Sequence, residues 1–255
     1  MTSCKLELRW LALAFLALLA IALWTAPAAA QFPEKFTNLQ VLPKDISPEQ
    51  LQSTMRGFTF GLGVRCDHCH VEKSDDAKQS GLNYAADDKQ TKKTARVMLQ
   101  MVAAINRDYI SKVSDMPAEP VKCVTCHRGL AQPRTLNSVL TDTIEEKGVD
   151  SALAQYQHLR QKYYGTGQYD FGETPLNQLT ESLLAQKKTK EAVAVMEMNF
   201  ASNHPDSLYA YHMLAQAHQA NGQIEKALAD YRKVLELHPD DDWAKEQIRS
   251  LSHSK

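Results

Sequence analysis

The pentapeptide Cys66-Asp67-His68-Cys69-His70 recurs in the same pattern as Cys123-Val124-Thr125-Cys126-His127. Both have the pattern Cys-x-x-Cys-His, which is typical of covalent attachment of c-type haem. Cysteines three positions apart place both sulfur atoms along one side of a porphyrin, and the histidine that follows can bind the iron. The two copies use every cysteine beyond residue 30. The sequence therefore predicts two haem c groups, attached through Cys66 and Cys69 and through Cys123 and Cys126, with His70 and His127 as iron ligands.

The first thirty residues have the pattern of an export signal. Lys5 and Arg9 precede the apolar run 11–24, and Ala28-Ala29-Ala30 supplies the small residues of a cleavage site. The run of about 14 residues is shorter than the roughly 20 that cross a bilayer as a helix. We therefore expect residues 1–30 to be a cleaved signal peptide and the protein to be periplasmic, either free or associated with a membrane complex. Cytochrome c maturation machinery is then the expected partner for haem attachment.

Composition divides the chain and excludes one class of partner. Both haem motifs precede Gln132-Pro133-Arg134, and no cysteine follows that stretch. We therefore expect a dihaem cytochrome c domain over residues 31–134 and a second, helical domain over residues 135–255. The chain has 29 Lys and Arg against 30 Asp and Glu, a balance that argues against a nucleic-acid-binding protein.

Each haem motif follows a predicted amphipathic helix. Ser47-Pro48-Glu49-Gln50 has the pattern of a helix N-terminal capping box, and apolar residues then recur at helical spacing. A polar loop over residues 72–86 separates the first motif from the next helix. We expect Asp87 or Asp88 to cap that second helix, which runs to about Val113. The order of helix, break and haem motif thus occurs twice.

The second half of the chain is repetitive. His204-Pro205-Asp206 recurs as His238-Pro239-Asp240, 34 residues later. Residues 208–241 have the spacing of a tetratricopeptide repeat, and residues 176–207 form a looser copy. Residues 149–156 resemble part of a third copy. The sequence therefore predicts two repeats and one partial repeat.

A predicted final helix over residues 242–250 would cap this stack. Stacked helix pairs create a concave surface, so we expect the repeats to dock another protein. The simpler alternative is a spacer or solubility module. The predicted fold class is all-α: a small dihaem cytochrome c domain organised by its haem groups, followed by a tetratricopeptide-like helical repeat domain.

The side of each iron opposite its histidine decides what the haem can do. A methionine thioether at that position raises the reduction potential and closes the iron to other ligands. Met55, Met98 and Met101 lie on the predicted helices that precede the two motifs. Methionine also packs adaptably in protein cores, so spacing alone leaves both roles open for each of them. His68 is a further candidate ligand for the other haem, although its place inside a motif is more typical of a surface residue.

Residues 38–130 resemble one half of the tetrahaem cytochrome subunit of photosynthetic reaction centres. The matching stretches are Asn38-Leu39-Gln40-Val41-Leu42, Met55 ahead of Cys66, Met98-Leu99-Gln100-Met101 leading to Ala104-Ile105-Asn106, and Val124-Thr125-Cys126-His127-Arg128-Gly129. The resemblance implies Met55 as the distal ligand of the first haem and Met98 as that of the second, with Met101 as the alternative. The family has four haem motifs where this chain has two, the resemblance does not reach the repeats, and no photosystem partner is inferred.

The leading functional hypothesis is electron transfer without catalysis. Two six-coordinate haems on one scaffold can accept an electron from one redox partner protein and pass it to another. One alternative is a dihaem peroxidase-like enzyme, and another is a haem-based sensor whose repeats relay ligand binding; each has an open iron site. A domain of about 100 residues with two haems has little protein core, so we expect that half not to fold without haem.

Overall fold

A computed structural model describes residues 36–73, 81–113, 118–203 and 206–253. The predicted signal peptide lies outside these residues. The chain forms two compact units: the first holds the described residues up to Thr54 together with Cys69–Leu99, and the second holds Met55–His68 together with the described residues from Gln100 onward. Nearly all regular structure is helical, which confirms the all-α fold class. None of the helices in the described ranges has the length and apolar character that a membrane span requires.

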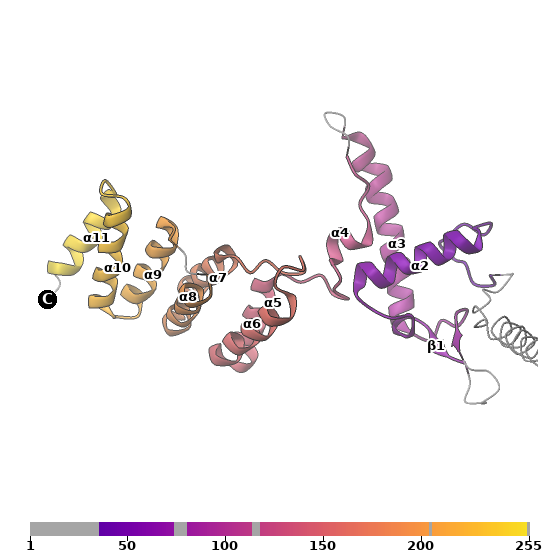
Figure 1. Cartoon of the computed structure of the whole chain (residues 1–255), viewed down its shortest axis with the longest axis horizontal. Coiled ribbons are helices and arrows are strands. Elements are labelled where there is room, and N and C mark those ends of the chain that lie inside the picture. Colours follow the sequence, from indigo (N-terminus) through magenta and orange to yellow (C-terminus); the bar gives the residue numbers. More distant parts are fainter. Residues whose placement is uncertain (1–35, 74–80, 114–117, 204–205, 254–255) are drawn as a thin grey trace, which may run out of the picture. The chain divides into compact units, whose positions relative to one another are not determined.

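Helix α2 (Pro48–Leu62) begins at the predicted capping box (Figure 1). The backbone N–H of Gln50 donates to Oγ of Ser47 at 3.2 Å, and the backbone N–H of Ser47 donates to Oε1 of Gln50 at 3.1 Å. Two backbone donors at the helix start are satisfied in this way, so the prediction for this helix is confirmed. The chain then reaches a 3₁₀ turn, η1 (Cys66–His68), at the first haem motif.

A short hairpin occupies part of the predicted polar loop. Strand β1 (Val71–Glu72) pairs in antiparallel fashion with β2 (Leu82–Asn83). The backbone N–H of Lys73 also donates to the carbonyl oxygen of Gly81 at 2.8 Å. The sequence predicted only a loop over residues 72–86, and it missed these two short strands, whose backbone groups pair with each other.

Helix α3 (Gln90–Asp108) is shorter than predicted at both ends. The carboxylate of Asp87 forms ion pairs with Lys92 at 2.9 Å and with Arg96 at 2.8 Å. These cations bind Asp87 three residues ahead of Gln90, so Asp87 does not cap the helix as predicted, and the alternative cap, Asp88, stays a prediction. After α3 the chain tightens into a 3₁₀ turn, η2 (Ile110–Lys112), so the prediction of one helix as far as Val113 is also wrong.

The repeat half consists of helix pairs stacked in chain order and capped by a last helix (Figure 1). The helices are α5 (Leu136–Lys147), α6 (Val149–Tyr163), α7 (Glu173–Ala185), α8 (Thr189–Asn203), α9 (Leu208–Ala220), α10 (Ile224–Leu237) and α11 (Asp242–His253). The predicted repeats correspond to α7/α8 and α9/α10, and the predicted capping helix is α11. The predicted partial repeat is α6, which pairs with α5, a helix that the sequence analysis did not identify.

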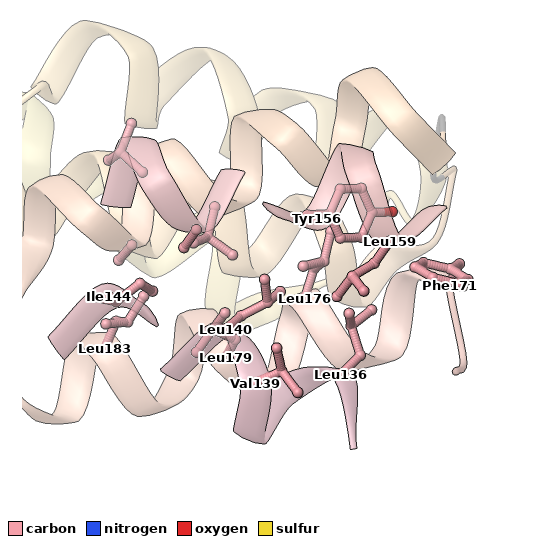
Figure 2. Close-up of a cluster of buried hydrophobic side chains, with 14 of the residues drawn as sticks. Leu136, Val139, Leu140, Ile144, Tyr156, Leu159, Phe171, Leu176, Leu179 and Leu183 are labelled. Carbon is pink, nitrogen blue, oxygen red and sulfur yellow. The ribbon is translucent and has the colours of Figure 1, made fainter. Parts of the chain in front are cut away.

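Apolar residues from successive helices form the core of the repeat half. Figure 2 shows Leu140 of α5, Tyr156 of α6 and Leu179 of α7 within one such cluster. Tyr156 and Tyr231 occupy matching positions in their repeats, and both are 0% exposed. The hydroxyl of Tyr231 donates to Oε1 of Gln219 at 2.7 Å, so its burial leaves no polar atom unsatisfied. The helices of the repeat half therefore bury apolar side chains between successive pairs.

A hydrogen-bond network around Arg160 of α6 joins this helix to α8. The guanidinium donates to the carbonyl oxygens of Phe171 at 3.1 Å and Ser202 at 3.0 Å. It also donates to Oδ1 of Asn203 at 3.1 Å and to the hydroxyl of Tyr156 at 3.3 Å. One side chain thus satisfies acceptors from α6, α8 and the loop between α6 and α7.

Candidate haem-binding site

Both haem motifs adopt short helical turns. The first begins in η1, and the second forms α4 (Cys123–His127). Cys66 and Cys126 are exposed, Cys69 and Cys123 are half-buried, and no disulfide joins the four described cysteines. Each motif thus presents one exposed and one half-buried cysteine.

A hydrogen bond to the backbone holds the imidazole ring of His127. Its Nδ1 lies 2.8 Å from the carbonyl oxygen of Leu130, which can only accept, so Nδ1 carries the proton and donates. The turn that brings this carbonyl back uses Arg128, with φ 50°, and Gly129, with φ 83°. Because Nδ1 is committed to this bond, Nε2 remains available to bind iron.

His70 has a different environment. Its Nδ1 is buried and has no hydrogen-bond partner among the described residues. Its ring meets the ring of Tyr84 edge-on, with centroids 5.1 Å apart. Burial, and then the positive charges of Lys92 and Lys89, lower the pKa of His70 below its ordinary value. The neutral imidazole, which is the form that binds metals, is therefore favoured.

Glycines allow the end of α2 to approach the second haem motif. The backbone N–H of Gly129 donates to the carbonyl oxygen of Gly61 at 2.9 Å. A Cβ at Gly63, where φ is +66°, would collide with the carbonyl oxygen of Gly129, and a Cβ at Gly61 would lie 3.0 Å from Cβ of Cys123. We call this contact the glycine junction. It brings the backbone just ahead of Cys66 against the segment that carries the second motif.

Asn106 of α3 holds the segment that leads into α4. Its Nδ2 donates to the carbonyl oxygen of Val121 at 2.9 Å, and its Oδ1 accepts from the backbone N–H of the same residue at 2.7 Å. The next residue, Lys122, donates its backbone N–H to Oγ1 of Thr125 at 3.0 Å, which closes the first turn of α4. This role of Asn106 was not predicted from the sequence. The only pattern that could have indicated it is a polar residue next to the apolar face of α3.

The three candidate methionines lie on α2 and α3 as predicted from the sequence. Met55 and Met98 are half-buried, whereas Met101 is 43% exposed. Met55 belongs to the same unit as Cys66 and the second motif, and Met98 belongs to the same unit as Cys69 and His70. The assignment of Met55 and Met98 as distal ligands stays a prediction.

The described residues before the repeats fit a domain that is organised by haem. Between residues 36 and 130 of the described chain, Leu51 is the only large hydrophobic residue in the core. Large apolar side chains are instead exposed there: Phe60, Tyr84, Val97, Met101, Tyr109, Val113 and Val124. A soluble domain seldom leaves so much apolar surface uncovered without a partner for it. Two porphyrins would cover such surface, and paired thiols with an imidazole are the groups that bind haem c.

Comparison with known proteins identifies the family. The sequence profile of the photosynthetic reaction centre cytochrome C subunit matches residues 21–220, and that of the tetratricopeptide repeat matches residues 208–241. The chain is 35% identical over 112 residues to the photosynthetic reaction center cytochrome c subunit of Thermochromatium tepidum, which covers 43% of this chain and 24% of that protein. It is 33% identical over 98 residues to cytochrome c-554 of Chloroflexus aurantiacus, which covers 38% of this chain and 21% of that protein.

These matches confirm the predicted resemblance and extend it. The chain spans about a quarter or less of the length of these curated relatives. The first tetratricopeptide domain of human RPAP3 aligns with 46% of this chain and 87% of its own, at 22% identity and a TM-score of 0.32, which is too low to support an inference. The family match continues to residue 220, so the expectation that the resemblance stops before the repeats is wrong. Because this match covers most of the chain and both haem motifs, the chain belongs to the photosynthetic reaction centre cytochrome c subunit family, whose members are electron-transfer cytochromes with covalently bound haem c.

Proposed function

We propose that this protein is a periplasmic dihaem c-type cytochrome that passes electrons between two redox partner proteins. The observation that carries the proposal is the pair of Cys-x-x-Cys-His turns in a half of the chain that has almost no core of its own. Haem c, once attached, supplies a reversible one-electron iron couple. The residues proposed to hold the two groups are Cys66, Cys69, His70 and Met55 for the first, and Cys123, Cys126, His127 and Met98 for the second.

The chain contributes fixed positions for these ligands. The bond from Nδ1 of His127 to Leu130 orients the imidazole, and Asn106 holds the backbone that leads into α4. The glycine junction holds the end of α2 against the same motif. Ligands held in this way need little rearrangement when the iron changes its oxidation state, which suits an electron carrier.

Carbon monoxide binding tests whether both irons are closed. We expect the purified protein to show two low-spin haems whose reduced spectrum does not change when carbon monoxide is added, because a thioether occupies each distal position. The variant Met98→Ala should open one iron, so carbon monoxide should then shift about half of the haem absorbance. Met101→Ala is the matched control on the same helix and should leave the spectrum unchanged. A shift in the wild-type protein would contradict the proposal and favour a peroxidase-like enzyme or a sensor.

The repeats are proposed to dock a partner of the cytochrome half. The match to the tetratricopeptide repeat and the stacked helix pairs support this role. Removal of residues 135–255 should leave the haem spectrum intact and lower several-fold the rate at which membranes of the source organism reduce or oxidise the protein. Loss of the haem spectrum in this truncation would contradict the proposed boundary between residues 31–134 and 135–255.

A further inference from the structure

The two proximal histidines differ in what their Nδ1 atoms contact. The Nδ1–H of His127 donates to a backbone carbonyl, whereas Nδ1 of His70 is buried without a hydrogen-bond partner among the described residues. A hydrogen bond from the far nitrogen of a ligating imidazole raises the basicity of the nitrogen that binds the metal. A more basic ligand favours ferric iron over ferrous iron. This difference alone would give the haem bound by His127 a lower reduction potential than the haem bound by His70.

A fixed positive charge lies beside His70. The ammonium of Lys92 donates to the carbonyl oxygens of Tyr84 at 2.9 Å and Ala86 at 2.6 Å, and it pairs with Asp87 at 2.9 Å. The side chain of Lys92 is only 12% exposed. Tyr84, whose carbonyl binds this ammonium, also packs its ring against the imidazole of His70. Lys92 therefore has little freedom to carry its charge away from the histidine.

Asp87 does not neutralise this charge alone, because it is shared with a second cation. Arg96 binds both carboxylate oxygens of Asp87, at 2.9 and 2.8 Å. Two cations therefore surround one carboxylate, and the local sum is positive. Positive charge near an iron centre favours the ferrous state, because that state carries one positive charge fewer.

We propose that Lys92 raises the reduction potential of the haem held by Cys66, Cys69 and His70 above that of the haem held by Cys123, Cys126 and His127. Electrons that enter the protein then settle on the first haem, which becomes the site from which they leave. This inference rests on the proposed function, because it requires a haem at each motif.

A redox titration followed by absorbance tests the proposal on the complete haem-loaded protein. The wild-type protein should titrate in two one-electron waves. Lys92→Met should lower the reduction potential of the upper wave by about 59 mV. For one electron this is a tenfold change in the equilibrium constant for reduction. A unit charge about 10 Å from the iron, in a medium with an effective dielectric constant of about 20, shifts the potential by an amount of this order. The lower wave should not move.

Matched variants distinguish the effect of the Lys92 charge from the effect of its hydrogen bonds to the loop at Tyr84. Lys93→Met removes the same charge from the next residue of α3, which is exposed, and should leave both waves in place. Lys92→Arg keeps the charge and should keep the potential. Asp87→Asn removes a negative charge and should raise the upper wave. If Lys92 acted only by holding the loop at Tyr84, then Lys92→Met and Asp87→Asn would shift the wave in the same direction.

The outcomes distinguish this inference from the proposed function. Two waves in the wild-type protein, with no response to Lys92→Met, would overturn the role of Lys92 and leave dihaem electron transfer in place. A response of the lower wave alone, or a downward shift in Asp87→Asn, would also overturn it. An intact mass that accounts for fewer than two covalently bound haems per chain would overturn the proposed function itself. If Lys92→Met failed to retain haem, the direction in which Asp87→Asn shifts the upper wave would still test the role of Lys92.

Discussion

Gly63→Ala is expected to disrupt the glycine junction and to lower the yield of protein that carries both haems severalfold. Gly63 has a φ of +66°, and the added Cβ would meet the carbonyl oxygen of Gly129, a backbone atom that cannot swing aside. The same displacement would stretch the hydrogen bond from Gly129 to Gly61. The left-handed backbone, the steric overlap and the lost hydrogen bond together should lower the free energy of unfolding by about 3 kcal/mol or more. Haem per protein, measured by absorbance and by intact mass, checks this result.

Gly57→Ala is the matched control for this substitution. Gly57 lies inside α2, six residues before Gly63, and a Cβ built there meets nothing within 4 Å. Alanine in a helix interior is favoured over glycine by roughly 0.5–1 kcal/mol, so Gly57→Ala should retain both haems and slightly raise the unfolding temperature. Equal haem content in the two variants would show that the close approach at Gly63 does not limit haem attachment.

The second large effect is expected at Arg160 in the repeat half. Arg160→Met keeps most of the side-chain volume but removes the donors to Phe171, Ser202, Asn203 and Tyr156. Hydrogen bonds from a charged group contribute about 1.5–3 kcal/mol each, and the remaining acceptors can regain part of this from water. We expect the free energy of unfolding of the repeats to fall by about 3 kcal/mol. Urea denaturation followed by far-ultraviolet circular dichroism measures it.

Arg249→Met provides the comparison for Arg160→Met. Arg249 is 68% exposed, and its ion pair is with Glu246, one turn away on α11. Exposed pairs of this kind contribute about 0–1 kcal/mol, so the urea midpoint should hardly move. The visible haem spectrum should stay unchanged in both variants, since neither residue belongs to the cytochrome half. A similar midpoint for the two variants would mean that the Arg160 network does not hold α6 to α8.

Signals confined to neighbouring residues, or repeated at a fixed period, were readable from the sequence. Ser47 and Gln50 cap α2 as predicted, because both partners of the capping box lie within one turn. The period of 34 residues located α9 and α10, and the family comparison confirms a tetratricopeptide repeat over residues 208–241. Helix α5 was missed because terminal repeats are often atypical, so its apolar residues showed no match to the later copies.

Contacts that reach beyond one helical turn were not readable from the sequence. Asp87 has the residue type of a helix cap, but Lys92 and Arg96 bind its carboxylate instead. Asn106 and Val121 lie 15 residues apart in sequence, and the glycine junction joins segments more than sixty residues apart. No single-sequence pattern encodes such pairs, since each depends on where two segments meet in space. The cysteines and histidines of the motifs needed no such information, because one local pattern contains them.

The shortage of buried apolar residues before the repeats also sets the order of events during biosynthesis. Residues 36–130 are made before residues 135–253, yet Leu51 is their only large hydrophobic residue in the core of the described structure. We therefore expect them to stay open until a porphyrin arrives, whereas the repeats can collapse at once around Tyr156 and Tyr231. On this expectation, the part of the chain that is made first would be the part that folds last. In a cell starved of haem, proteases would trim the open half and leave a folded C-terminal fragment behind.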